Sequence, residues 1–205
     1  MHAIKKSPAV EYNRLKLDYA STHRDIVEKC KRGNRRAQFE LYRLYSKAMY
    51  NVCLRMVRNE QDAEDLLQNS FLDVFSKLHT FRFQSSVGAW IKRITVNNCI
   101  NHLKRNRLFF EELEERHVEV PAKAEQEEMD EPPLGLDVES VKKAVYGLPD
   151  GYRAVFTLYL FEGYDHKEIA SILEITEATS KSQYSRARKK LKELLETNRL
   201  GMAGK

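Results

Sequence analysis

The sequence predicts an all-α protein made of two small helical domains. Over most of its length apolar residues recur at intervals of three or four, the spacing of one helix face. No segment alternates apolar with polar residues as a half-buried strand would. Apolar residues make up 42% of the 205 residues, enough for packed cores and against a chain disordered throughout.

A Pro-containing acidic segment interrupts the helical pattern and separates the two domains. Residues 111–139 hold twelve acids and two bases, a local net charge of −10; the whole chain carries +5, so the remainder carries +15. Prolines do not fit helix interiors, so we predict a flexible acidic linker, with an acidic surface helix over 111–128 as the alternative for part of it. A basic body interrupted by an acidic segment is typical of proteins that bind polyanions.

These features divide the chain into five parts. They are an N-terminal extension (1–20), a first domain (21–107), the linker (108–136), a second domain (137–197) and a C-terminal tail (198–205).

Composition argues against several other classes of protein. No apolar run approaches the roughly 20 residues of a membrane helix, and the first residues lack the pattern of a secretion signal. Three scattered cysteines suit a reducing cytoplasm better than a disulfide framework. Cys99 and His102 stand one turn apart, but no second pair follows at zinc spacing, and no phosphate loop or catalytic motif occurs. We therefore predict no metal, no cofactor and no catalysis.

Three helices are predicted in the first domain. Asn34 is a candidate N-cap for the first, and Asn59 for the second. The third runs from about Val87 to Lys104, after a turn-like "FRFQSSVG". The apolar stripes of the first two helices are Tyr42, Tyr45, Met49, Val52 and Met56, and Ala63, Leu67, Phe71, Val74 and Leu78.

The third of these helices carries a second, polar stripe. Its members, spaced 4, 3 and 4, are Trp90, Ile94, Asn97 and Asn101. The better core candidates lie in another sector and are Val96, Cys99, Ile100 and Leu103. Amides and an aromatic ring among cations can hold bases and phosphates, but a core tryptophan with solvated asparagines fits the spacing equally well.

The second domain is predicted to contain four helical pieces, of which the last two form a helix-turn-helix. Asp165 and Glu168 fit a capping box that opens "HKEIASIL", and Thr176 is a candidate cap for the last helix. The short "EIT" turn between them lacks the glycine that is frequent in this motif.

The last helix has two distinct faces. The face that can pack inward holds Ser180, Tyr184, Ala187, Leu191 and Leu194, and the opposite face holds Ser182, Ser185, Arg186 and Lys189, with Lys181 on a flank. Short hydroxyls beside long cations are typical of a helix that reads the DNA major groove. A solubilising basic face is the alternative for such a helix alone, but as the second helix of a helix-turn-helix in a basic protein it favours DNA binding.

Two segments together resemble a known family. "NEQDAEDLLQNSFLDVFSKL", followed by "FRFQSSVGAWIKRITVNNCINHLKR", resembles region 2 of bacterial sigma factors. "GLPDGYRAVFTLYLFEGYDHKEIASILEITEATSKSQYSRARKKL" resembles their region 4. No region-3 domain intervenes, which is the layout of the extracytoplasmic-function (ECF) group.

The resemblance implies partners and residues for each surface. Core RNA polymerase, through its beta-prime clamp and beta subunits, promoter DNA and an anti-sigma factor are the implied partners. The implied location is the cytoplasm, or the membrane through such an anti-sigma factor. The positions matching the helix that docks on the clamp are Asp65, Gln68 and Asn69. Those matching -10 recognition, including the loop that captures an extruded base, are Phe81, Arg82, Gln84, Ser85, Ser86, Trp90, Ile94, Asn97 and Asn101. Those matching -35 recognition are Lys181, Ser182, Ser185, Arg186 and Lys189.

The chain departs from the family pattern at several of these positions. Phe83-Gln84 replaces a frequent Gly-Asp, and Val87-Gly88 lacks an aromatic often found there. Ser185 replaces a bulkier residue, and Tyr159 stands where a phosphate-binding arginine can occur. The base captured by the loop and the preferred -35 sequence therefore do not follow from the resemblance. A free-standing helix-turn-helix regulator is the alternative, but it would not need the docking helix or the base-capturing loop.

Overall fold

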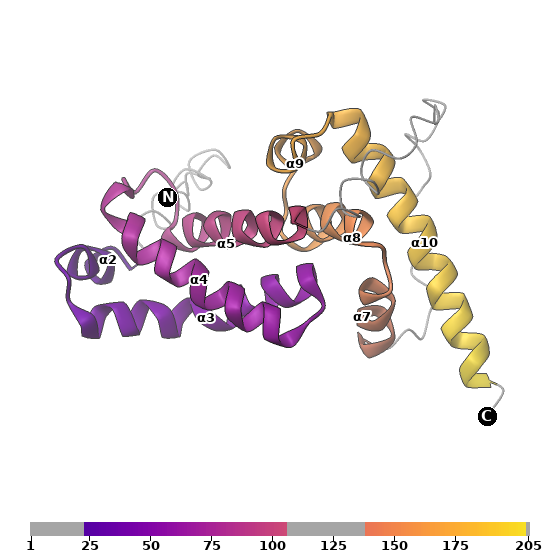
Figure 1. The fold of residues 1–205 in the computed structure, drawn as a ribbon, viewed down its shortest axis with the longest axis horizontal. Coiled ribbons are helices and arrows are strands. Elements are labelled where there is room, and N and C mark those ends of the chain that lie inside the picture. Colours follow the sequence, from indigo (N-terminus) through magenta and orange to yellow (C-terminus); the bar gives the residue numbers. More distant parts are fainter. Residues whose placement is uncertain (1–22, 106–137, 204–205) are drawn as a thin grey trace, which may run out of the picture. The chain divides into compact units, whose positions relative to one another are not determined.

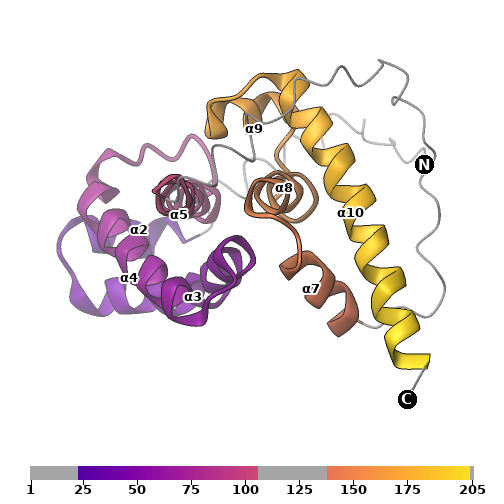
Figure 2. The ribbon, with the colours of Figure 1, turned by 45° about the vertical axis from the view of Figure 1, so that its right-hand side comes forward.

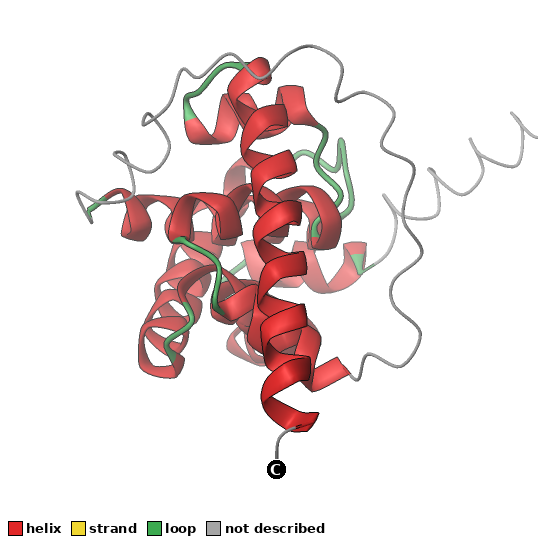
Figure 3. Ribbon diagram, turned by 90° about the vertical axis from the view of Figure 1, so that its right-hand side faces the viewer, coloured by secondary structure: helices red, strands yellow, loops and turns green. Residues whose placement is uncertain are grey.

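The computed structural model describes residues 23–105 and 138–203, which are helical with short connections and contain no strand (Figure 3). The predicted extension 1–20 and linker 108–136 lie outside these residues. Within the described residues, contacts divide the chain into two compact units, residues 23–53 with 60–98 and residues 54–59 with 99–105 and 138–203. The all-α prediction is confirmed.

The first unit begins with a short helix and a long one. Helix α2 spans Arg24–Lys31, and α3 spans Arg35–Val57 (Figure 1). The predicted N-cap of α3 is present, because the Ala37 amide donates to Asn34 Oδ1 at 3.0 Å. Met49, Val52 and Met56 of the predicted stripe are buried, whereas Tyr42 and Tyr45 are half-buried.

The next helices along the chain follow the predicted pattern, and the end of α5 after residue 98 belongs to the second unit. Helix α4 spans Glu60–Lys77, a 3-10 turn η1 spans Leu78–Thr80, and α5 spans Val87–Lys104, as predicted. All five members of the second stripe are buried: Ala63, Leu67, Phe71, Val74 and Leu78. The predicted core positions of α5 are buried as well: Val96, Cys99, Ile100 and Leu103.

Tyr45 of α3 joins the starts of two other helices in the first unit. Its hydroxyl lies 2.9 Å from Nδ1 of His23, the residue before α2. Its ring lies so close to Gly88 of α5 that a Cβ at that position would meet Tyr45 Cε1 at 2.8 Å. Burial raises the pKa of the Tyr45 phenol, which therefore remains a neutral hydrogen-bonding group at physiological pH.

The second unit contains α7 (Val138–Tyr146) and α8 (Asp150–Phe156), and α8 continues into the π-helical turn η3 (Thr157–Phe161). The wider turn is closed by the Glu162 amide, which donates to the Thr157 carbonyl at 3.1 Å. Periodicity did not predict this change of helix type. After the buried Leu158, the turn exposes three large side chains in succession, Tyr159, Leu160 and Phe161.

The predicted helix-turn-helix is present as α9 (His166–Leu173) and α10 (Glu177–Ala203) (Figure 2). The Asp165–Glu168 capping box is complete, and the Thr179 amide donates to the predicted cap, Thr176 Oγ1, at 3.0 Å. Glu174 occupies the left-handed position of the turn, with φ 62°, where glycine is more usual. Helix α10 continues to Ala203, past the predicted end of the domain at 197.

The long helix α10 packs along α8, α9 and α7 of its own unit (Figure 2). The centre of this packing is a buried cluster of Val145, Leu148, Phe156 and Ala187. Tyr184, Leu191 and Leu194 pack against the cluster, as the predicted inward face of α10 requires. The buried Arg153 donates to the Leu148 carbonyl at 2.8 Å and to Asp150 Oδ1 at 2.5 Å, which satisfies part of its charged group inside the unit.

Gly88 gives a test of the packing around Tyr45. Alanine in a helix is normally more stable than glycine by about 0.5–1 kcal/mol. Here the added methyl would overlap a ring that is held at its far end by His23. Gly88→Ala should therefore lower the free energy of unfolding, by about 1–3 kcal/mol in urea denaturation.

The matched control is Gly88→Ala in a Tyr45→Ala background, where the methyl has space and the extra loss should disappear. A single Gly88→Ala variant that is more stable than the wild type would contradict the close approach.

Candidate functional site

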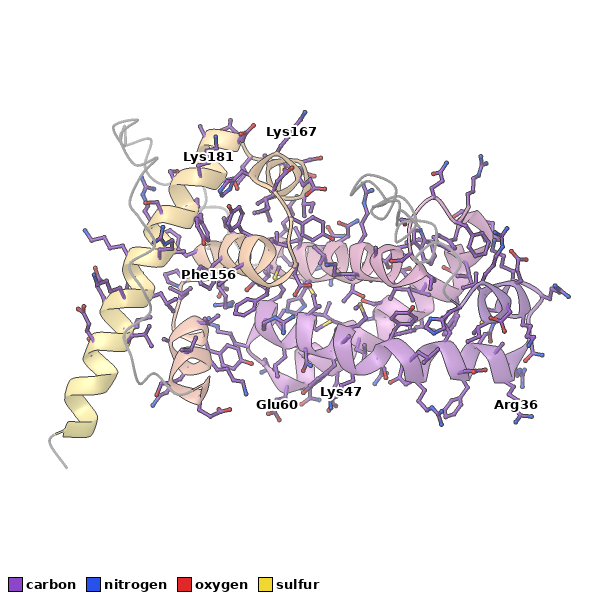
Figure 4. The ribbon with its side chains drawn as sticks, turned by 180° about the vertical axis from the view of Figure 1, so that it is seen from behind. Arg36, Lys47, Glu60, Phe156, Lys167 and Lys181 are labelled. Atoms are coloured by element: carbon purple, nitrogen blue, oxygen red, sulfur yellow. The ribbon has the colours of Figure 1, made fainter. Side chains whose placement is uncertain are left out.

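The outward face of α10 carries the residues predicted to read DNA. Lys181, Ser185 and Lys189 are exposed, and Ser182 and Arg186 are half-buried. Ser180 and Ala187 on the opposite face are fully buried. Figure 4 shows Lys181 in the first turns of α10, near Lys167 of the preceding helix. The structure thus presents the five predicted -35 residues on one helix whose other side belongs to the core.

A polar and aromatic cluster fixes α10 against the rest of its unit. Nδ1 of His166 lies 2.9 Å from the buried Ser180 hydroxyl. The His166 ring stacks on Tyr159 with centroids 4.5 Å apart, and Tyr159 lies at the same distance from Tyr184. Tyr159 is therefore a packing residue here, at the position where an arginine can occur in the family.

Gln183 is a residue of α10 that the sequence-based prediction assigned to neither face of the helix. Its side chain is only 1% exposed, although it lies between the exposed Lys181 and Ser185. Burying an amide is unfavourable unless it is hydrogen-bonded, so position 183 is structurally constrained. A polar residue within the inward sector of the wheel is the signal that could have revealed it.

Helix α5 presents the predicted -10 stripe. Asn97 and Asn101 are exposed, and Trp90 and Ile94 are half-buried. Between them Asn98 turns toward α4, where its Nδ2 donates to Asp73 Oδ2 at 3.1 Å. This hydrogen bond fixes the rotation of α5 about its own axis. The exposed amides of Asn97 and Asn101 therefore point to solvent on one face.

The loop before α5 combines a buried aromatic residue with exposed polar residues. Phe81 is 4% exposed and packs against Trp90 at 5.2 Å between centroids, so its ring supports the loop from below. Arg82, Gln84 and Ser85 are exposed. Ser86 caps α5, because its Oγ accepts from the Ala89 amide at 3.1 Å. Of the predicted loop residues, the structure exposes three fully and gives Phe81 and Ser86 supporting contacts.

The exposed face of α4 holds the predicted docking residues Asp65, Gln68 and Asn69. Leu72, four residues after Gln68, lies on the same face and is 68% exposed. Leu72 was not among the predicted docking residues, although continuing the spacing of Gln68 and Asn69 by one turn would have included it. An exposed leucine among amides and a carboxylate gives this face both an apolar and a polar part.

Comparison with known proteins matches both halves of the chain. Residues 41–109 match sigma-70 region 2, and residues 138–191 match sigma-70, region 4. The ECF RNA polymerase sigma factor SigM of Bacillus subtilis is 31% identical over 162 residues, which cover 76% of this chain and 93% of that protein. The chain belongs to the ECF sigma factors. It directs promoter-specific initiation of transcription.

Other relatives of this sigma factor agree in extent. RNA polymerase sigma-H factor of Pseudomonas aeruginosa is 29% identical over 186 residues, covering 83% of this chain and 92% of that protein. The solved sigma factor RpoE of Bartonella quintana, in complex with the anti-sigma factor NepR, has 26% identity and a TM-score of 0.52, covering 77% of this chain and 95% of its own. CnrH, solved with the cytosolic domain of CnrY, has 22% identity, the same TM-score, and coverage of 85% and 97%, which supports the fold.

The described residues hold neither a group of metal ligands nor a membrane span. In residues 23–105 and 138–203, no three His, Cys, Asp or Glu residues lie where they could hold a metal ion together. Cys99 is buried, and His102 is half-buried. None of the described helices has the length and apolar character needed to cross a membrane.

His166 gives the sigma factor a testable pH dependence. Its pKa is lowered from the ordinary value of 6.5, first by burial and then by the positive charge of Lys181. As the pH falls below about 6.5, the unfolded chain therefore takes up this proton before the folded chain does, and folding loses stability. Above that value His166 is neutral in both states and has no such effect.

The melting temperature of the wild type should therefore fall more, between about pH 7.5 and pH 5.5, than that of His166→Phe, which keeps a ring over Tyr159 and cannot titrate. An NMR titration should place the His166 midpoint below 6.5. A midpoint above 6.5 would contradict the environment described here.

Proposed function

We propose that this sigma factor works through three separate surfaces. Helix α4 docks on the beta-prime clamp of core RNA polymerase, the 81–86 loop and α5 hold the -10 element, and α10 reads the -35 element. The observation that carries the proposal is the outward face of α10, where hydroxyls and cations stand opposite a buried face. The predicted domains 21–107 and 137–197 divide these tasks.

The docking surface combines a specific polar contact with an apolar one. The Asp65 carboxylate can accept paired hydrogen bonds from an arginine of the clamp, and the amides of Gln68 and Asn69 can extend them. Leu72 adds an exposed apolar side chain that a partner would remove from water. A full burial of such a side chain contributes about 1.5–3 kcal/mol, so Leu72 is an anchor of the interface in this proposal.

The -10 surface suits unpaired bases. The exposed amides of Asn97 and Asn101 can donate to and accept from base edges. The half-buried Trp90 ring at the start of α5 offers a face on which a base can stack. The exposed Arg93 and Arg105 of the same region can bind the phosphates of the strand.

The -35 surface suits duplex DNA. Arg186 can bind a guanine edge with two hydrogen bonds, and Ser182 and Ser185 are short enough to let α10 enter the major groove. Lys181 and Lys189 are more exposed than Ser182 and Arg186, and their long side chains fit phosphate contacts. Ser185 replaces a bulkier residue that the family often carries on this face, so we expect this chain to prefer its own -35 sequence.

The remaining partners follow from the family. RpoE, at 26% identity, was solved with an anti-sigma factor, and we infer that an anti-sigma factor also controls this chain. We expect the chain to act in the cytoplasm, or at the membrane while such a partner holds it there. In this proposal the chain itself is not an enzyme, because the polymerase forms the bonds of the transcript.

Run-off transcription with purified core polymerase tests the docking surface. Asp65→Arg would place a cation against the arginines of the clamp, and Leu72→Ser would remove the apolar anchor. Each should lower core affinity by about 2 kcal/mol, roughly 30-fold, and reduce transcript accordingly. Both positions are exposed, so thermal unfolding should change little.

Glu60→Arg is the matched control, because Glu60 is also exposed but lies about 140° around the helix from Asp65 and is not three or four residues from any docking residue. It makes the same change of charge outside the docking face and should leave transcription intact. Equal losses in the Glu60 and Asp65 variants would refute the assignment of the face.

The -35 surface is tested by selecting randomised -35 sequences with the holoenzyme. Arg186→Ala should cost about 1–3 kcal/mol and relax the preference at one position of the element, because a base-edge contact is lost. Lys189→Ala should weaken binding to all sequences alike, since a phosphate contact carries no base identity. An Arg186→Ala variant with unchanged affinity and unchanged base preference would show that α10 is only a solvated basic face.

A further inference from the structure

Phe83 is the unusual residue of the loop between η1 and α5. Its φ is +57°, in the left-handed region that a bulky L-residue rarely adopts. Glycine occupies such positions without steric conflict, and asparagine or aspartate with little. A phenylalanine there persists only if neighbouring groups hold it, and those groups can be identified.

Two cations from α2 lie against the Phe83 ring. Cζ of Arg24 is 4.6 Å from the ring centroid, and Nζ of Lys31 is 4.7 Å from it. Both distances lie within the roughly 6 Å over which a cation is attracted to an aromatic ring. The Phe81 ring adds an aromatic contact at 4.9 Å between centroids.

Lys31 also binds the backbone of the loop. Its Nζ donates to the Phe81 carbonyl at 2.8 Å, and its side chain is 20% exposed. The ammonium group therefore contacts the loop both before Phe83 and at its ring. Glu28, 3.7 Å away on the same helix, balances its charge.

Helix α2 is a firm support for these contacts. Ile26, Val27 and Cys30 are buried, so the helix is packed along its length. Its start is held by the contact of His23 with Tyr45, which reaches α3. A side chain fixed on α2 can therefore fix the loop.

We propose that Phe83 is a positioning residue, clamped by Arg24 and Lys31, that pre-forms the 81–86 loop for the unpaired base of the -10 element. The inference rests on the proposed function of that loop. Arg82 and Gln84, exposed on either side of Phe83, take their directions from its backbone conformation. A loop already in its binding conformation loses less conformational entropy when DNA enters, which raises affinity.

The first experiment compares holoenzymes on two DNA fragments, a fork junction with an unpaired -10 strand and a duplex with only the -35 element. Phe83→Leu keeps an apolar side chain but removes the aromatic face, and Lys31→Met keeps the stem but removes the charge. If the loop is then competent only about a tenth of the time, fork affinity falls about tenfold. Affinity for the -35 duplex and for core polymerase should not change.

Phe83→Tyr is the conservative control. It keeps the aromatic face, so this variant should bind the fork junction with nearly the affinity of the wild type. Wild-type fork binding by Phe83→Leu, or an equal loss in Phe83→Tyr and Phe83→Leu, overturns the proposal.

The second experiment measures the loop without DNA. Trypsin cleaves after the exposed Arg82, and peptide mapping of the full chain follows that bond alone. Lys31→Met leaves the residues around the bond unchanged and should accelerate this cleavage, because the loop opens more often. Unchanged cleavage overturns the clamp whatever the DNA result. A wild type with no preference for the unpaired strand would instead overturn the proposed function of the loop, and faster cleavage in Lys31→Met would still support the clamp.

Discussion

The contact of Tyr45 with Gly88 is the constraint on which the first unit depends. One phenol ring of α3 fills the space that a side chain on α5 would need, and its hydroxyl reaches the start of α2. Helix α5, with the residues predicted to bind the -10 element, and helix α2 are therefore both set against the same ring. An interior packed as tightly as a crystal transmits such a constraint, since a shift at one side of the ring must move the other.

In the second unit, the orientation of α10 depends on buried polar groups as much as on apolar packing. The apolar cluster around Ala187 holds α10 against its unit, but apolar contacts alone tolerate more alternative packings than directional hydrogen bonds do. The Ser180 hydroxyl beside His166 and the enclosed amide of Gln183 allow far fewer arrangements. A helix that reads base edges, as proposed for α10, needs a fixed rotation about its own axis, and the contact of His166 with Ser180 contributes to fixing it.

Most helices, with their starts and faces, could be predicted from the sequence because their causes are local, whereas α2 and the continuation of α10 to Ala203 were not predicted. The Asn34 cap, the Asp165 capping box and the buried stripe of α4 each depend on residues a turn or two apart. The π-helical turn, the buried ring of Phe81 and the left-handed Phe83 depend on contacts between distant segments, which periodicity does not contain. Leu72 was not predicted for a different reason. Its exposure can be explained only by a binding partner, and the partner is not part of the chain.

The ion pair at the start of α10 affects how this helix would enter a complex. Lys181 lies 3.2 Å from the Glu177 carboxylate, one turn earlier. When a lysine or arginine binds a DNA phosphate, it releases a cation that was condensed on the DNA. Because of this release, the affinity falls as the salt concentration rises. Lys181 is instead already paired in part with a carboxylate of its own helix, and a phosphate would compete with Glu177 for it. In the proposed complex, the share of Lys181 in the salt dependence would therefore be smaller than that of a solvated lysine.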